Sequence, residues 1–152
     1  ESNQIGLHGI SLGASTSIFA AYYEPEILAI WSDSSLAEFN MILKDEIARY
    51  GLSIEFGPSV SLAGKMLTGI DPTTLSPAFK LSKNQFYFFT HGDKDERVLI
   101  HHFDFFKEYI NKNNIKAEFW LVKDSYHVDA MFKYPDEYGI KLKNFFEEHL
   151  NN

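Results

Sequence analysis

The stretch Gly6-Leu7-His8-Gly9-Ile10-Ser11-Leu12-Gly13-Ala14 is the part of the sequence from which the fold can be worked out. It contains a G-x-S-x-G pentad centred on Ser11 and preceded by the largely apolar residues 4–7, which predict a buried strand. Residues 14–23 follow with apolar side chains at helical spacing, so the pentad is the sharp turn between a strand and a helix. We expect this crowded turn to favour residues without a side chain on both sides of the serine, at Gly9 and Gly13.

The same turn makes Ser11 a candidate nucleophile. Its side chain stands at the apex of the turn and at the N-terminus of the following helix. A negatively charged oxygen that forms there meets backbone N–H groups and the positive end of the helix dipole. The pentad is a weak signal by itself, but between a strand and a helix it is typical of a serine nucleophile.

The composition is that of one domain with a large core. The chain has 152 residues, 45% of them hydrophobic and 16% aromatic, including 14 Phe. A net charge of −7 argues against nucleic acid or an anionic membrane as the main partner, and no apolar run is long enough to span a bilayer. Without cysteine there is no disulfide, thiol nucleophile or cysteine-bound metal. The composition leaves the compartment open, with the cytoplasm as the favoured assignment.

Strands and helices alternate along the chain, which predicts parallel strand pairing through crossover connections. Further strands are expected at residues 27–31, 86–90 and 117–122, and further helices at 36–50, 60–67, 99–110 and from Pro135 onward. Either Ser34 or Ser35 is expected to cap the helix over 36–50. The fold class is therefore α/β, with a parallel sheet of about four strands, helices on both faces and an irregular, lid-like stretch over about 34–81.

Three of the predicted strands end in residues that can act together chemically. The first strand leads to Ser11, the third to Asp93 or Asp95, and the fourth to His127. Functional groups gather beyond the carboxyl ends of parallel strands, so we expect these side chains to meet. A serine hydroxyl needs a base such as histidine, and the histidine needs a carboxylate to orient it. The residues alone do not separate Asp93 from Asp95.

Three motifs in this order resemble those of a known family. They are residues 8–14 around Ser11, His91-Gly92-Asp93-Lys94-Asp95-Glu96-Arg97-Val98, and residues 127–132 with Tyr134-Pro135 following. The chain resembles the C-terminal half of an α/β-hydrolase, in the branch of the prolyl-oligopeptidase-like enzymes and related esterases. The resemblance implies a catalytic triad with Ser11 as nucleophile on the nucleophile elbow, His127 as general base and Asp95, by the family pattern H-G-x-x-D, as the acid. It also implies an oxyanion-hole N–H from Leu12 and neither a cofactor nor a metal.

The chain departs from this family at its beginning. A complete member has several strands before the serine, and one of their loops supplies the second oxyanion donor. We therefore interpret residues 1–152 as the C-terminal part of a single α/β-hydrolase domain whose N-terminal strands are missing. The first strand then has an open edge, to which the missing half or a second copy in a homodimer can pair. Losing one oxyanion donor costs ~10²–10³ in rate, so the chain alone is expected to be weakly active or inactive.

The other histidines have simpler interpretations. His8 is expected to pack within its strand, and His91 to make a structural hydrogen bond. His101, His102 and Asp104 suggest a metal site but lack ligand spacing on a common face, so we expect an exposed helix start. Solvated loop charges are the simpler interpretation of the two acids that flank His127, Asp124 and Asp129.

The sequence thus predicts a serine hydrolase that cleaves a small acyl ester, thioester or amide through an acyl-enzyme. An esterase is favoured over the first alternative, a serine peptidase of the prolyl-oligopeptidase type with a peptide substrate. The second alternative is a non-catalytic association module that uses the open sheet edge. The substrate itself cannot be read from the sequence.

Overall fold

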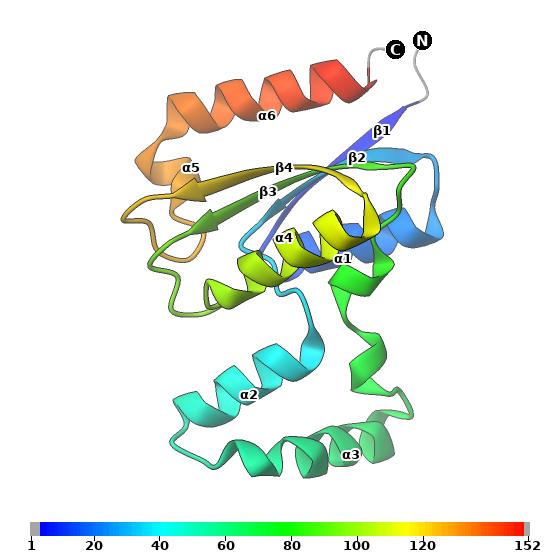
Figure 1. Cartoon of the computed structure of the whole chain (residues 1–152), viewed down its shortest axis with the longest axis vertical. Coiled ribbons are helices and arrows are strands. Elements are labelled where there is room, and N and C mark those ends of the chain that lie inside the picture. Colours follow the sequence, from blue (N-terminus) through cyan, green and yellow to red (C-terminus); the bar gives the residue numbers. More distant parts are fainter. Residues whose placement is uncertain (1–3, 151–152) are drawn as a thin grey trace.

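The computed structural model describes residues 4–150 and shows a four-stranded parallel sheet between two layers of helices (Figure 1). The order of the strands across the sheet is the order of the chain. The strands are β1 (Ile5–Ile10), β2 (Ile27–Asp33), β3 (Phe86–Gly92) and β4 (Lys116–Val122). The predicted parallel sheet is confirmed; β1, β2 and β3 run two or three residues beyond the apolar runs that predicted them, and β4 begins one residue earlier than predicted.

One face of the sheet is covered by α1 (Leu12–Tyr23) and α4 (His101–Asn113). The apolar faces of both helices are buried with the strands in one cluster, to which α1 contributes Ile18 and α4 contributes Phe103 and Phe106. Helix α4 ends where Asn114 adopts a left-handed conformation with φ 52°, a common way to stop a helix.

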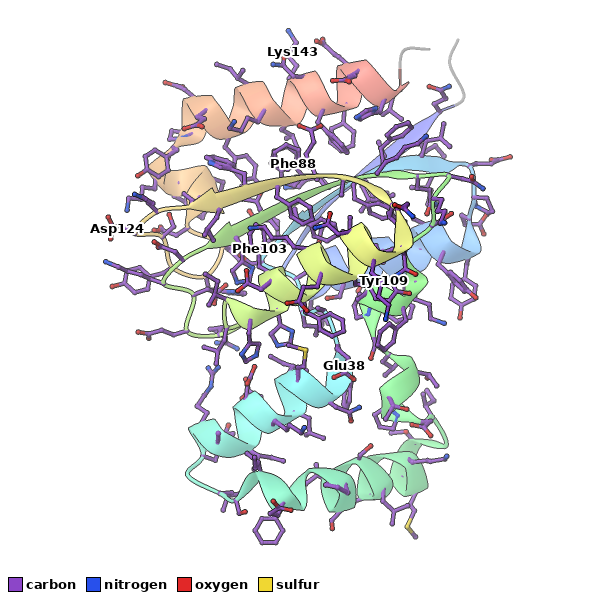
Figure 2. All side chains as sticks on the ribbon, in the orientation of Figure 1. Glu38, Phe88, Phe103, Tyr109, Asp124 and Lys143 are labelled. Carbon is purple, nitrogen blue, oxygen red and sulfur yellow. The ribbon has the colours of Figure 1, made fainter. Side chains whose placement is uncertain are left out.

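The opposite face is covered by α5 (Ala130–Lys133) and α6 (Pro135–Leu150). Its core centres on Trp31, whose ring stacks on Phe88 at 3.8 Å and lies edge-on to Phe145 of α6. Figure 2 shows Phe88 on the α6 side of the sheet and Phe103 on the α4 side, so side chains fill both interlayer spaces. The expected helices on both faces are therefore present.

Helices α2 (Phe39–Arg49) and α3 (Gly57–Thr68) project away from the sheet (Figure 1). With the short helices η1 (Ile54–Phe56) and η2 (Pro72–Thr74) they form what we call the helical arm, residues 39–74; η3 (Pro77–Lys80) leads back to β3. Apolar side chains of the arm face solvent, among them Met66 at 79% and Leu67 at 87% exposure. The prediction of Ser34 or Ser35 as the cap of α2 was wrong, because the helix begins only at Phe39 and its cap is Glu38, whose carboxylate accepts from the N–H groups of Asn40 and Met41.

Strand β1 lies at one edge of the sheet. Within residues 4–150 it pairs only with β2, so the other edge of β1 carries no strand in the described part of the chain. Among the same residues, no helix combines the length and hydrophobicity that crossing a membrane would need.

Candidate active site

Ser11 occupies the turn between β1 and α1 in a backbone conformation that most residues avoid. Its φ is 53° and its ψ is −120°, and its N–H donates to the carbonyl oxygen of Asp33 at 2.8 Å. Such a conformation costs free energy and persists only where the surrounding structure holds it. The result is a serine side chain directly before a helix of 12 residues, as the sequence predicted.

Only one of the two glycines of the pentad is required by its surroundings. A Cβ on Gly9 would collide with the carbonyl oxygen of Gly13 and would lie 2.6 Å from Cα of Ala14. A Cβ on Gly13 would meet nothing within 4 Å. The expectation of a steric need for glycine on both sides of the serine was therefore wrong for Gly13, which faces solvent on the first turn of α1.

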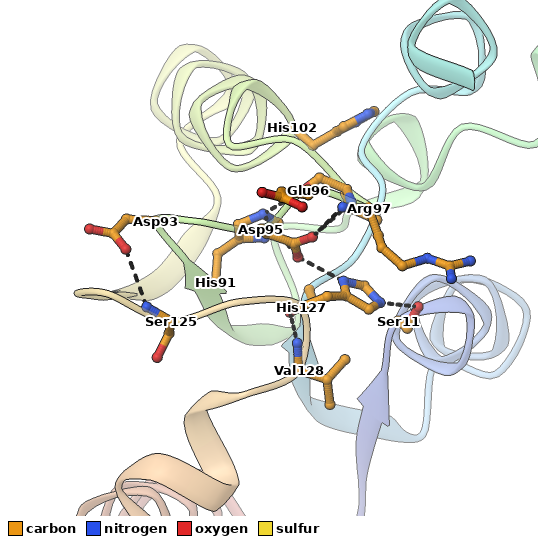
Figure 3. A network of polar contacts seen from close by, with 12 residues as sticks. Ser11, His91, Asp93, Asp95, Glu96, Arg97, His102, Ser125, His127 and Val128 are labelled. Atoms are coloured by element: carbon orange, nitrogen blue, oxygen red, sulfur yellow. Dashed lines mark hydrogen bonds and ion pairs between the residues drawn. The ribbon is translucent and has the colours of Figure 1, made fainter. Parts of the chain in front are cut away.

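The structure brings Ser11, His127 and Asp95 into one hydrogen-bonded chain (Figure 3). Nε2 of His127 lies 2.8 Å from Oγ of Ser11, and Nδ1 lies 2.7 Å from Oδ2 of Asp95. A carboxylate only accepts, so Nδ1 carries the proton and Nε2 accepts from the serine hydroxyl. The three residues stand beyond the carboxyl ends of β1, β3 and β4, where parallel strands deliver functional groups.

Asp95 is held as an ionised, buried carboxylate. Its Oδ1 accepts from the N–H groups of Arg97 and Val98, each at 2.9 Å. Burial alone would raise its pKa, but the hydrogen bond from His127 and these two backbone donors outweigh it, so the pKa of Asp95 is lowered. Asp93 instead accepts from the N–H of Ser125 at 3.3 Å and does not face His127 (Figure 3).

The loops after β3 and β4 approach each other closely. A Cβ on Gly92 would collide with the carbonyl oxygens of Ser125 and Tyr126, so only glycine fits where the two loops cross. The N–H of Lys94 donates to the carbonyl oxygen of Ser125 at 2.9 Å and ties the loops together. This contact brings the acid of one loop within reach of the histidine of the other.

A cavity of about 150 Å³ opens at Ser11. Helix α2 of the arm forms one wall of it through Ile42 and Glu46. The other lining residues are Ser11, Leu12, Leu36, Arg97, Val98 and His127. Another cavity, of about 220 Å³, is lined by residues that include Phe86 and His149 and lies at the end where β3 begins, opposite the end that carries Asp95.

Comparisons with known proteins identify the fold of this chain. No family model and no curated protein matches the sequence. Among solved structures, a Pyrococcus furiosus esterase matches with a TM-score of 0.69 at 21% identity, over 97% of this chain and 54% of the esterase. The acylaminoacyl peptidase of Pyrococcus horikoshii matches with a TM-score of 0.74 at 18% identity, over 100% of this chain and 25% of the peptidase.

This chain has part of an α/β-hydrolase fold. A carbohydrate esterase from gut microbiota, in truncated form, matches as well, with a TM-score of 0.72 at 16% identity over 97% of this chain and 60% of that one. The chain thus spans about half the length of the esterases it matches and a quarter of the peptidase. The predicted resemblance of the fold to the C-terminal half of an α/β-hydrolase is therefore confirmed.

The two neighbouring histidines at the start of α4 differ from their prediction. His101 is exposed, but His102 is fully buried, so the expected exposed helix start was wrong for His102. Both rings bond Oδ2 of Asp45 on α2, at 2.8 and 3.2 Å, while Asp104 is not part of the group. Nδ1 of His102 accepts from the N–H of Ala37, so its Nε2 carries the proton and has no lone pair for a metal. The cluster therefore joins the arm to the sheet domain.

Other polar residues have local partners. His91 is buried and its Nε2 donates to the carbonyl oxygen of Val98 at 2.8 Å, which confirms the expected structural hydrogen bond. His8 is more exposed than expected, although Nε2 reaches the hydroxyl of Tyr138 at 2.8 Å. Asp124 is exposed and pairs with Lys94, and Asp129 precedes α5.

Some residues of the cavity and of the support below the site carry no motif that marks them in the sequence. Ile42 and Glu46 of α2 line the cavity, and Ser34 accepts from the N–H of Val128. A helix after the second strand was predicted, but nothing in its periodicity says that it returns over the site. The Asp33-Ser34 pair at the end of β2 was a usable signal, since polar residues there stand at the functional edge of the sheet.

Proposed function

We propose that the chain carries the reactive centre of a serine hydrolase, with Ser11 as nucleophile, His127 as general base and Asp95 as the acid that orients the base. The observation that supports this proposal is the unbroken hydrogen-bonded chain from Oγ of Ser11 through both nitrogens of His127 to Asp95. Each residue has the partner that its role demands.

In the proposed reaction, Oγ of Ser11 forms a bond to a carbonyl carbon while its proton passes to Nε2 of His127. The tetrahedral intermediate collapses, and the leaving alcohol takes that proton from the imidazolium. An acyl-enzyme remains, and a water activated by His127 repeats the sequence and releases the acid. Asp95 stays ionised and stabilises the imidazolium, in keeping with its lowered pKa.

The oxyanion of each intermediate needs donors that are already in place. The N–H of Leu12 is the first of α1 and, like the other first-turn N–H groups of a helix, has no carbonyl of its own helix to bind. With the positive end of the helix dipole it supports an oxyanion site beside Ser11. We assign this N–H as one donor and expect a second from outside the described residues.

The cavity supports a substrate with a short acyl group. Its volume of about 150 Å³ is below the ~300–1,000 Å³ of sites that enclose drug-sized ligands. Four of its eight lining residues are apolar, namely Leu12, Leu36, Ile42 and Val98. We therefore propose a small acyl ester as the preferred substrate over a peptide. The similarity to esterases and peptidases supports hydrolysis of an ester or amide bond.

The open edge of β1 supports a second role, as a site of association. An N-terminal half of the same protein, or a second copy, would pair with this edge. A stable dimer without turnover of any acyl ester would favour an association module over an enzyme.

A fluorophosphonate probe tests the proposal directly. We expect the intact protein to react at Ser11, as located by mass spectrometry of the labelled peptide, and Ser11→Ala to abolish labelling. Ser17→Ala is the matched control, because Ser17 lies on α1 and bonds the carbonyl oxygen of Gly13. A folded intact protein that stays unlabelled would contradict the proposal. Turnover of acetyl against longer acyl esters then tests the substrate.

A further inference from the structure

Three non-glycine residues with positive φ meet around the site. Ser11 has φ 53°, Ser34 has φ 54° and Val128 has φ 59°. For the β-branched Val128 this conformation is a marked outlier, which the surrounding structure must hold. Ser34 follows β2 directly, and Val128 follows His127. The three strained positions are thus the serine itself, the loop that carries His127 and the segment that follows β2.

Ser34 connects to the histidine loop through its hydroxyl. Oγ of Ser34 accepts from the N–H of Val128 at 3.2 Å, a bond that spans 94 residues of sequence. Val128 stands next to His127 at the point where the loop turns away from the site (Figure 3). The backbone of Ser34 is itself fixed, because its N–H donates to the carbonyl oxygen of Thr90 at 2.9 Å.

Asp33 sets the direction of that hydroxyl. The Asp33 side chain is buried, with 1% of the residue exposed, and its Oδ1 accepts from the Ser34 hydroxyl at 2.9 Å. A hydroxyl has one proton, so this bond leaves only lone pairs of Ser34 to face Val128. Oδ2 of Asp33 accepts from the Tyr138 hydroxyl at 2.9 Å, and Tyr138 also contacts Nε2 of His8. Burial raises the pKa of Asp33, and the two hydroxyl donors counter it.

We infer that Ser34, oriented by Asp33, is a positioning residue that holds the loop after His127 so that the imidazole faces Ser11. The inference rests on the proposed function. Ser34 does not touch the reacting atoms, and its effect passes through the backbone of Val128. Asp33 supports the same assembly twice, since its own carbonyl oxygen accepts from the N–H of Ser11.

Two variants remove the hydroxyl in different ways. Ser34→Ala leaves the strained φ in place, whereas Ser34→Gly removes the hydroxyl and relieves the strain. A small displacement of a catalytic group costs up to ~10²-fold in rate, so we expect kcat to fall about 10- to 100-fold in both variants, with KM within about twofold. Ser35→Ala is the matched control, because Ser35 is equally buried but bonds Ser15. We expect its kcat to stay at the level of the unchanged protein.

A second measurement is independent of activity. Hydrogen exchange of the Val128 amide, followed by NMR, should speed up at least tenfold in Ser34→Ala and Ser34→Gly and stay unchanged in Ser35→Ala. Unchanged exchange in the Ser34 variants would show that the bond does not hold the loop and would overturn the inference.

The outcomes separate this inference from the proposed function. A folded, unsubstituted protein that neither hydrolyses esters nor reacts with the fluorophosphonate overturns the proposed function, and the inference with it. An active protein in which both Ser34 variants keep the full kcat overturns the inference alone. If Ser34→Gly restores kcat while Ser34→Ala loses it, strain and not the hydroxyl is responsible, and the inference is again wrong.

Discussion

Asp93 and Asp95 stand two residues apart after β3, yet the structure gives them different partners. The N–H of Asp95 donates to the carbonyl oxygen of Gly92 and closes the turn. The N–H of Asp93 donates to the carbonyl oxygen of Val122. This geometry points Asp95 to His127 and leaves Asp93 with Ser125. The chemistry of the loop does not separate the two aspartates, because both are followed by charged residues, and only the family pattern H-G-x-x-D pointed to Asp95.

Asp95→Asn tests the role proposed for the carboxylate. The amide keeps the size of the side chain but no longer enforces the tautomer in which Nδ1 of His127 carries the proton. We expect kcat to fall about 10⁴-fold. Asp93→Asn is the control and should keep kcat within a few-fold. Steady-state kinetics on an acyl ester measures both, and a loss in Asp93→Asn alone would reverse the assignment.

The two glycines of the pentad are expected to respond in opposite ways to alanine. Gly9→Ala places a methyl group against the backbone of Gly13 and Ala14, and we expect a loss of about 1–3 kcal/mol in the free energy of unfolding. Gly13→Ala places a methyl group in open space on a helix, which should stabilise the protein by about 0.5–1 kcal/mol. Urea denaturation of both variants checks the prediction. Equal losses would show that both positions are crowded.

At the scale of elements, the attachment of the helical arm is the feature that periodicity did not reveal. The amphipathic pattern of residues 36–50 predicted a helix, and α2 forms there. Its place depends on long-range contacts, in which Asp45 bonds both histidines of α4 and Arg49 donates to the carbonyl oxygens of Glu96 and Arg97. Strands and helices could be predicted because burial imposes a period on the sequence, whereas such polar contacts impose none.

The junction between α2 and α4 makes stability depend on pH. Burial, together with the neighbouring His101, lowers the pKa of His102 to about 4, against opposing attraction from Asp45. The unfolded chain binds a proton at this histidine near its ordinary value of about 6.5, so it takes up more protons than the folded state between about 6.5 and about 4. Stability should therefore fall as the pH is lowered through this interval, by up to about 1.4 kcal/mol per pH unit.

Urea denaturation at a series of pH values measures this slope, and His102→Asn should flatten it. The comparison uses the slope and not the absolute stability, because the variant also loses the hydrogen bond from Ala37. An unchanged slope in His102→Asn would assign the pH dependence to other groups.

At the scale of the whole molecule, two separate cores flank one sheet and the arm contributes little to either. The core toward α1 and α4 includes Phe106, and the core toward α6 includes Phe145. The sequence predicted both, because apolar stripes on the helices and continuous apolar strands require burial on both sheet faces. It did not predict how exposed the apolar residues of the arm are, since hydrophobicity alone does not tell a core helix from one that faces outward.

Alanine substitutions should separate these parts. Phe106→Ala and Phe145→Ala each remove a fully buried ring, and we expect losses of about 3–5 kcal/mol in the free energy of unfolding. Leu67→Ala changes a side chain that faces solvent and should stay within about 0.5 kcal/mol. Urea denaturation of the three variants is the measurement. A large loss of unfolding free energy in Leu67→Ala would show that the side chain of Leu67 is buried.

The arm leaves and re-enters the sheet domain at one point, where the N–H of Ala78 donates to the carbonyl oxygen of Ala37 at 3.0 Å. With its ends fastened there, the segment can lengthen, shorten or be exchanged without altering the register of β2 and β3. It also supplies one wall of the cavity at Ser11. A change in the arm can therefore alter what enters the cavity and leave in place the strand ends that position Ser11, Asp95 and His127.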